Sequence, residues 1–270
     1  MRVAIIGMGA IGHVVAKALE GRVEILRVDR TKAPLRGGEA AVALALVTTK
    51  TFGTEWAAEQ AARVLARDGL AITLQNGLGN HEILAARLGA ERAGIGVIYV
   101  GAQLRPDGSL FATGPGRVEL GHGRHVDELA RLLAAGGMTV TVVRDPWRAV
   151  WTKVLVNAAM NPTTALLSCT NGALLDHPAG RPLADEIARE TARVATAAGV
   201  PIGDEDGIRA WREIARTLGA NRSSMLQDVE ARRTTEVDAI NGAVAREGAR
   251  RGIAAPLNDA MRVLVESLVA

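Results

Sequence analysis

The chain has 270 residues, of which 48% are hydrophobic and 23% are charged, so it can bury a large core and is neither disordered nor a coiled coil. Its net charge of +3 comes from scattered basic residues, whereas a nucleic-acid-binding face needs clustered charge. Nucleic acid is therefore not an expected partner.

Nothing in the sequence predicts membrane insertion or export. No apolar run approaches the roughly 18 residues of a membrane-spanning helix, and residues 1–12 are too short and too interrupted by glycine for a signal peptide. Cys169 is the single cysteine, which excludes an internal disulfide and is typical of a reducing compartment. We therefore expect a soluble, cytoplasmic protein with no membrane partner.

The first half of the chain alternates short apolar runs with helical patterns. The runs typical of buried strands cover residues 2–6, 23–28, 41–47, 70–74, 95–100 and 140–143. The helical patterns extend to residue 19, over 54–66, from 80 onward and over 126–135. Turn sequences between residues 104 and 120 predict short antiparallel strands. This alternation predicts an α/β unit with an open, mostly parallel sheet.

The pattern changes after Pro146. Ala, Leu, Arg and Glu at helical spacing dominate residues 147–270, and no convincing strand pattern remains there. We therefore predict two domains, an α/β domain over residues 1–146 and an all-helical domain over residues 147–270.

A glycine-rich turn follows the first predicted strand and opens the first predicted helix. In such a turn the first glycine allows a tight bend, the second lets a pyrophosphate approach the backbone, and the third packs the helix on the sheet. The diphosphate then rests on the amino terminus of the helix. The sequence therefore predicts a Rossmann-type dinucleotide-binding domain, with cofactor contacts at Gly7, Met8, Gly9, Ala10, Ile11 and Gly12.

The residues after the second and third predicted strands leave the choice of dinucleotide open. Asp29 stands where an acidic side chain would bind a ribose 2′-hydroxyl and favour NAD. Arg30 follows it and would pair with a 2′-phosphate, which favours NADP. Lys50 can reach that phosphate or the diphosphate, or can be a solvated loop lysine.

Asn76 lies just beyond the predicted strand 70–74. Ligands bind at the carboxyl ends of strands in open α/β sheets, so Asn76 is a candidate ligand-binding residue. Asn76 and Gly77 also form a common turn pair, which is the structural alternative.

Lys153, Asn157 and Asn161 are spaced four residues apart in an otherwise apolar helical stretch, so they share one helix face. A buried cation and two amides cost free energy unless a polar group meets them, and a substrate is one such group. Only four of the 32 basic residues are lysines, and a lysine pKa, unlike that of arginine, shifts readily. The alternatives are that Lys153 extends its ammonium to water and that Asn161, before Pro162, ends the helix.

The sequence contains no pattern for metal binding or for hydrolytic or phosphoryl-transfer chemistry. No pair of histidines has the spacing of metal ligands. The five histidines are His13, His81, His122, His125 and His177. We therefore expect no metal site.

Taken together, these blocks resemble ketopantoate reductase (2-dehydropantoate 2-reductase), and the match spans nearly the whole chain. The resemblance rests on the glycine turn and the segment Gln75-Asn-Gly-Leu-Gly, and on more specific motifs in the second half. These motifs are Trp151-x-Lys153-x-x-x-Asn157-x-x-x-Asn161-Pro162, Asn171-Gly172, Ser223-Ser-Met-Leu-Gln-Asp228 and Thr235-Glu236-Val-Asp-x-Ile-Asn241-Gly242.

The resemblance implies a Rossmann-type domain followed by an all-α substrate domain, and NADPH-dependent reduction of ketopantoate to (R)-pantoate in pantothenate synthesis. It implies that Lys153 is the proton donor and that Glu236 anchors Lys153 or the cofactor ribose. The implied substrate-binding residues are Lys153, Asn157, Asn161, Asn171, Asn221 and Ser224. The implied cofactor-binding residues beyond the glycine turn are Arg30, Lys50, Asn76, Ala102 and Glu236.

Two departures from the family pattern leave alternatives open. Only about a dozen residues, 30–41, join the second and third strands, where the family has a longer insertion, and Asp29 replaces a more usual neutral residue. NADH is thus an alternative to NADPH. The alternative functions are a related 2-keto acid reductase and a non-catalytic dinucleotide-sensing protein. A homodimer is a candidate assembly, because Rossmann dehydrogenases with helical second domains often pair.

Overall fold

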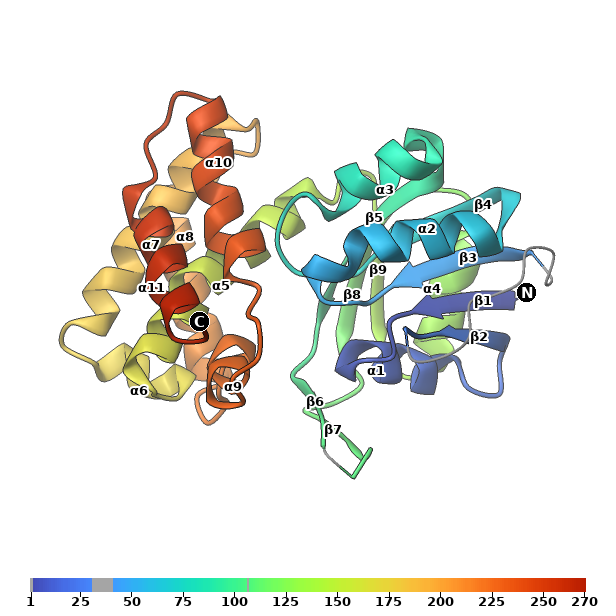
Figure 1. The fold of residues 1–270 in the computed structure, drawn as a ribbon, viewed down its shortest axis with the longest axis horizontal. Helices are drawn as coiled ribbons and strands as arrows, with labels where there is room; N and C mark the ends of the chain where they lie inside the picture. Colours follow the sequence, from blue (N-terminus) through green and yellow to red (C-terminus); the bar gives the residue numbers. More distant parts are fainter. Residues whose placement is uncertain (1, 31–40, 106) are drawn as a thin grey trace. The chain divides into compact units, whose positions relative to one another are not determined.

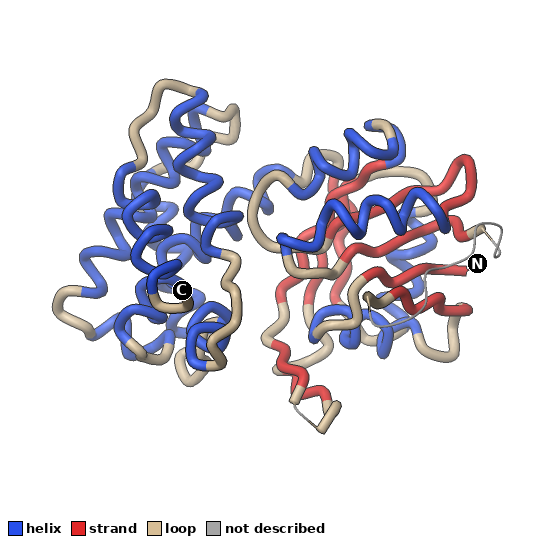
Figure 2. Tube along the Cα trace, viewed as in Figure 1, coloured by secondary structure: helices blue, strands red, loops and turns tan. Residues whose placement is uncertain are grey.

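The computed structural model describes residues 2–30, 41–105 and 107–270, which form two compact units (Figure 1). The first unit comprises Met1–Gln75 and Gly79–Pro146, and the second comprises Asn76–Leu78 and Trp147–Ala270. The tube drawing shows strands in the first unit, whereas the second is helical (Figure 2).

The first unit is built on a twisted sheet of seven strands among the described residues, in the order β2-β1-β3-β4-β5-β8-β9. The strands β1 to β5 are parallel, β8 runs antiparallel to β5, and β9 runs parallel to β8. The predicted mostly parallel sheet is thus confirmed. The strands are β1 (Arg2–Ile6), β2 (Glu24–Val28), β3 (Val42–Val47), β4 (Leu65–Thr73), β5 (Ala93–Tyr99), β8 (Arg117–Gly121) and β9 (Thr139–Val143).

Helices cover both faces of this sheet (Figure 1). Helices α1 (Ala10–Leu19) and α4 (Val126–Ala135) pack on one face, and α2 (Thr54–Val64) and α3 (Asn80–Leu88) pack on the other. Successive strand side chains point to opposite faces. In β1, Val3 and Ile5 therefore join the core under α1, while Ala4 and Ile6 join the core under α2.

Residues 104–120, for which the sequence predicts short antiparallel strands, contribute to two separate sheets. Strands β6 (Ala102–Leu104) and β7 (Leu110–Ala112) form an antiparallel pair of their own, whereas β8 joins the main sheet. Short 3-10 turns lie at Thr51–Gly53 and Ala90–Arg92.

All regular structure described in the second unit is helical. Helix α5 lies in the middle of its core, because Leu155, Ala158 and Ala159 are fully buried together with side chains of α7, α8 and α11. The helices are α5 (Trp147–Leu167), α6 (Asn171–Asp176), α7 (Gly180–Ala197), α8 (Asp204–Thr217), α9 (Ser224–Glu230), α10 (Ala243–Arg250) and α11 (Pro256–Ser267), with a π-helical turn at Asp238–Gly242.

Helix α5 continues through Pro162 to Leu167, so Asn161 lies within the helix and not at its end. A proline has no N–H and therefore cannot donate to the carbonyl four residues earlier, that of Ala158. The Nδ2 group of Asn241 donates to this carbonyl at 3.1 Å. A side chain from the π turn thus replaces the missing helical hydrogen bond.

Across the described parts of the chain, no helix combines the length and the apolar character needed to cross a membrane.

Candidate functional site

The glycine turn connects β1 to α1 and lies against the end of β3. Gly7 has φ +104°, and a Cβ there would lie 2.6 Å from the backbone nitrogen of Thr49. The Thr48 hydroxyl donates to the Gly7 carbonyl at 2.6 Å. Because β2 and β3 lie on either side of β1, this turn stands at the switch point of the sheet, where open α/β sheets bind ligands.

The other two glycines differ in their surroundings. A Cβ on Gly12 would lie 2.1 Å from the Gly7 carbonyl oxygen, so only glycine lets α1 start so close to the turn. A Cβ on Gly9 would have no described atom within 4 Å. Gly9 precedes the first residue of α1, where backbone N–H groups point out of the helix. The turn therefore offers open space beside donors suited to a diphosphate.

Polar side chains connect the carboxyl ends of β3 and β4 in the first unit. The side-chain amide of Gln75 donates through Nε2 to the hydroxyls of Thr49 at 3.1 Å and Thr54 at 2.9 Å. Its Oε1 accepts from Thr73 at 2.9 Å. Lys50 follows Thr49 and precedes the 3-10 turn. The motif pointed to Gln75 only as a neighbour of Asn76, and its bridging role was not predicted.

Arg30 follows β2, and its guanidinium carbon lies 5.3 Å from the centre of the Trp56 ring, within the range of a cation–π contact. It is exposed, whereas the preceding Asp29 is partly buried. Ala102 is the first residue of β6. The shortened connection that follows Arg30 lies, for residues 31–40, outside the described residues.

Lys153 and Glu236 interact electrostatically within the second unit. Lys153 is partly buried on α5, and Glu236 is only 6% exposed. Burial lowers the pKa of Lys153 from 10.5 to about 8, and the negative charge of Glu236 acts in the opposite direction. Burial thus outweighs the attraction. A lysine with such a pKa holds a proton at neutral pH and releases it readily.

Asn76 belongs to the same group, although it is far away in sequence. Its Nδ2 donates to Glu236 Oε2 at 3.2 Å, and the N–H of Leu78 donates to the Ala239 carbonyl at 3.0 Å. Between them, Gly77 has φ +77°, and a Cβ there would lie 2.3 Å from the same carbonyl oxygen. Asn76 thus lies in a glycine turn and also contacts Glu236, while its role in ligand binding stays a prediction.

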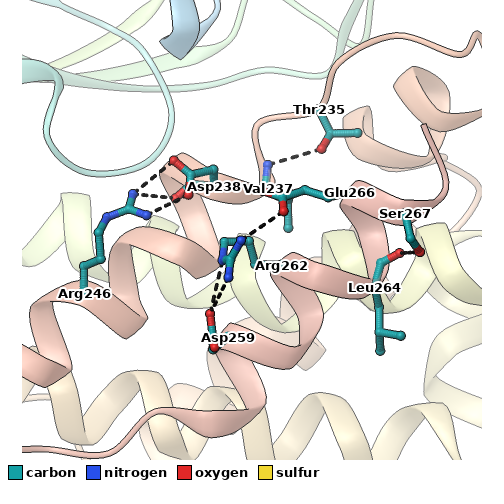
Figure 3. Close-up of polar contacts among 9 residues, drawn as sticks. All are labelled: Thr235, Val237, Asp238, Arg246, Asp259, Arg262, Leu264, Glu266 and Ser267. Atoms are coloured by element: carbon teal, nitrogen blue, oxygen red, sulfur yellow. Dashed lines mark hydrogen bonds and ion pairs between the residues drawn. The ribbon is translucent and has the colours of Figure 1, made fainter. Parts of the chain in front are cut away.

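The backbone around Glu236 is held by local contacts (Figure 3). The Val237 N–H donates to the Thr235 hydroxyl at 3.4 Å, and Asp238 pairs with Arg246 of α10 at 2.6 Å. The carbonyl of Glu236 accepts from the Ile240 N–H. The π-helical turn Asp238–Gly242, hereafter the π turn, follows directly. Such turns occur frequently at functional sites.

The two asparagines of the predicted stripe lie on α5. Asn157 is partly buried like Lys153, one turn away, whereas Asn161 is only 4% exposed. The backbone carbonyl of Asn161 accepts from the Thr164 hydroxyl at 3.0 Å. The helix thus keeps all three polar residues in regular register.

The remaining predicted residues lie near the amino ends of α6 and α9. The Asn171 N–H donates to the Asn221 carbonyl at 2.9 Å. The buried Asn171 Oδ1 has no hydrogen-bond partner among the described residues. Ser224 is exposed in the first turn of α9.

Ser223, which belongs to a sequence motif but has no predicted role, caps α9. Its buried hydroxyl accepts from the Leu226 N–H at 3.1 Å and from the Thr164 hydroxyl of α5 at 2.8 Å. In the sequence, the only indication of this cap was the pair of neighbouring serines, Ser223 and Ser224.

Within residues 2–30, 41–105 and 107–270, no three His, Cys, Asp or Glu side chains are grouped to hold a metal ion.

Comparison with known families identifies the family of the chain. Residues 37–125 match the family model of ketopantoate reductase PanE/ApbA, and residues 145–268 match that of the ketopantoate reductase PanE/ApbA C terminal. A 2-dehydropantoate 2-reductase of Halobacterium salinarum is 34% identical, over 95% of this chain and 95% of that protein. The chain belongs to the ketopantoate reductase family. The predicted family membership is thus confirmed.

Further members of the ketopantoate reductase family and related structures extend this similarity. The 2-dehydropantoate 2-reductase of Archaeoglobus fulgidus is 32% identical over 99% of this chain and 97% of its own. A solved 2-dehydropantoate 2-reductase of Geobacter metallireducens has a TM-score of 0.88 at 28% identity, covering 99% of both chains. A D-mandelate dehydrogenase solved with NADH and anilino(oxo)acetate has a TM-score of 0.90 at 25% identity, covering 100% of this chain and 98% of its own.

Proposed function

We propose that this chain reduces ketopantoate to (R)-pantoate, with Lys153 as the proton donor. The observation that carries the proposal is the group of Lys153, Glu236 and Asn76, in which a partly buried lysine with a lowered pKa lies beside a buried carboxylate. A dinucleotide-sensing protein needs no proton donor, so this group favours an enzyme.

The proposed chemistry assigns one task to each part of the site. A bound nicotinamide dinucleotide would supply the hydride that adds to C2 of the keto acid. Lys153 holds the ketone oxygen and transfers a proton to it as negative charge develops there. Glu236 and Asn76 orient the ammonium, and Asn157 and Asn161 position the substrate from the same helix as Lys153. Asn171, Asn221 and Ser224 are proposed as further substrate contacts.

The first unit fits a dinucleotide. The open space at Gly9 and the first N–H groups of α1 suit the diphosphate, and Thr48 holds the turn in place. We propose NADPH as the preferred form, because the guanidinium of Arg30, placed over Trp56, is suited to a 2′-phosphate. Lys50 and Ala102 are proposed as further contacts.

A second candidate is a reductase of another 2-keto acid that uses NADH. It is favoured by Asp29 and by the similarity to the D-mandelate dehydrogenase solved with NADH. A homodimer and a cytoplasmic location stay predictions from the sequence.

The experiment that separates these candidates is an assay of NADPH and NADH oxidation with ketopantoate, 2-ketoisovalerate, oxaloacetate and benzoylformate. We expect the highest kcat/KM with ketopantoate and NADPH. A higher kcat/KM with another keto acid would contradict the proposed substrate. Arg30→Ala should raise KM for NADPH by about tenfold or more and leave KM for NADH nearly unchanged.

A further inference from the structure

A chain of buried polar side chains crosses the second unit from α7 to α5. It begins at Glu190 of α7, which is only 2% exposed. Its carboxylate accepts from the backbone N–H groups of Leu257 at 3.1 Å and Asn258 at 2.8 Å. Pro256, the first residue of α11, has no N–H. Glu190 therefore satisfies the first backbone donors of α11, where a negative charge is also favoured by the helix dipole.

The chain continues through two asparagines that are both 0% exposed. Asn258 donates through Nδ2 to Glu190 Oε1 at 2.8 Å, and its Oδ1 accepts from Asn241 Nδ2 at 3.0 Å. The same Nδ2 group of Asn241 donates to the carbonyl of Ala158, which Pro162 cannot reach with a hydrogen bond. Glu190, Asn258 and Asn241 are hereafter the buried polar chain.

The carboxylate determines which way both amides face. A carboxylate only accepts hydrogen bonds, so Asn258 must direct its NH2 toward Glu190 and its oxygen toward Asn241. Asn241 must then present its own NH2, which is also what the Ala158 carbonyl requires. The hydrogen-bond pattern thus fixes the orientation of both amides.

Asn241 lies in the π turn, five residues after Glu236, and its acceptor Ala158 lies five residues after Lys153 on α5. It therefore connects the two segments that carry the charged pair. On the exposed side of the π turn, Asp238 pairs with Arg246 (Figure 3). Exposed ion pairs contribute little to stability, so the buried hydrogen bond from Asn241 to Ala158 is the stronger restraint on the π turn.

We propose that Asn241 is a positioning residue for the reaction, because it holds the π turn that follows Glu236 on the part of α5 that follows Lys153. Glu190 and Asn258 orient its amide. This inference rests on the proposed function of Lys153 and Glu236. The charge of Glu236 acts on Lys153 with a strength that falls with distance, so a displaced π turn changes both the pKa of Lys153 and its orientation toward the substrate.

The test is a pH profile of ketopantoate reduction for Asn241→Leu, which removes the amide but keeps a side chain of similar size. We expect kcat to fall by about 10- to 100-fold while KM for the dinucleotide stays unchanged. The alkaline limb of kcat/KM should move to lower pH, because Glu236 raises the pKa of Lys153 less from a greater distance. Wild-type kcat and an unmoved limb would overturn the proposal.

A matched control separates positioning from general destabilisation. Asp185, also buried on α7, accepts from Trp211 Nε1 at 3.1 Å and pairs with Arg212. Asp185→Ala should lower Tm without moving the alkaline limb, and an equal shift in this variant would overturn the proposal.

A second variant covers the case in which Asn241→Leu does not fold. Glu190→Gln replaces one acceptor oxygen by a donor and should move the limb in the same direction by a smaller amount. An unmoved limb in this folded variant would overturn the proposal.

Lys153→Ala separates a failure of the proposed function of Lys153 from a failure of the positioning role of Asn241. If it keeps turnover, the proposed function of Lys153 fails. If it loses turnover while Asn241→Leu behaves as wild type, only the role of Asn241 fails.

Discussion

Lys153 illustrates how one side chain acquires a chemical role from its surroundings. On a solvated helix its pKa would stay near 10.5. Burial on α5 lowers the pKa to about 8, even though Glu236 opposes the shift. An acid is most effective when its pKa lies near the working pH. The partly buried position of Lys153 on α5 is therefore part of its proposed function.

The pH dependence of the reaction follows from this pKa. Lys153 must be protonated to act as the acid, and its protonated fraction falls as the pH rises through about 8. We therefore expect kcat/KM for keto acid reduction to decline above about pH 8 with an apparent pKa near that value. The profile should be measured at saturating dinucleotide. Activity that stays constant up to pH 10 would contradict a buried lysine acid.

Some site residues could be predicted from the sequence, and others could not. The stripe of Lys153, Asn157 and Asn161 could be predicted, because helical periodicity is local. Ser223 could not be distinguished from Ser224, since both fit a capping position. The choice depends on Thr164, whose hydroxyl donates to Ser223 from 59 residues away in sequence. Such a contact exists only after the helices pack.

At the scale of elements, helix α5 is the clearest case of tertiary contacts overriding a local rule. The residue before a proline disfavours helical geometry, so the sequence left the end of the helix open. In the structure the helix continues, because Asn241 bonds the carbonyl that Pro162 leaves free. The partner lies 83 residues after Ala158, and no local pattern could indicate it.

The glycine turn makes a paired prediction. Gly12→Ala should destabilise the fold, because the new Cβ would lie 2.1 Å from the Gly7 carbonyl oxygen. Gly9→Ala should fold with a Tm close to wild type, since no described atom lies within 4 Å of its Cβ, yet bind dinucleotide more weakly because the methyl occupies the space of the diphosphate. Thermal unfolding and fluorescence titration with NADPH check both. Equal dinucleotide affinity in Gly9→Ala and wild type would contradict the assigned site.

The segment that carries Asn76 allows a second prediction from a pair of glycine substitutions. Gly77 and Gly79 both have positive φ, +77° and +88°, so alanine is strained at either position. Only at Gly77 would the Cβ also meet the Ala239 carbonyl, at 2.3 Å. Gly77→Ala should therefore displace Asn76 from Glu236 and lower kcat. Gly79→Ala should lower Tm through backbone strain alone, without the same loss of kcat. Similar kcat values for the two variants would argue against the role of Asn76.

At the scale of the whole molecule, the two units carry different parts of the proposed chemistry. The first provides a glycine turn at the switch point of a parallel sheet, and the second provides the lysine and its carboxylate. The change from alternating strands and helices to helices alone could be read from sequence periodicity. The sequence did not show that β8 joins the main sheet antiparallel to β5, nor that Asn76–Leu78 groups with the second unit. Both depend on contacts between distant segments.

The central claim is that Lys153 donates the proton in ketopantoate reduction. The most direct measurement is the steady-state kcat of Lys153→Ala with ketopantoate and NADPH, with dinucleotide affinity and Tm measured on the same preparation. We predict a loss of about 10²- to 10⁴-fold in kcat with dinucleotide affinity near that of the wild type. A folded Lys153→Ala variant that keeps kcat within about tenfold of the wild type would contradict the account.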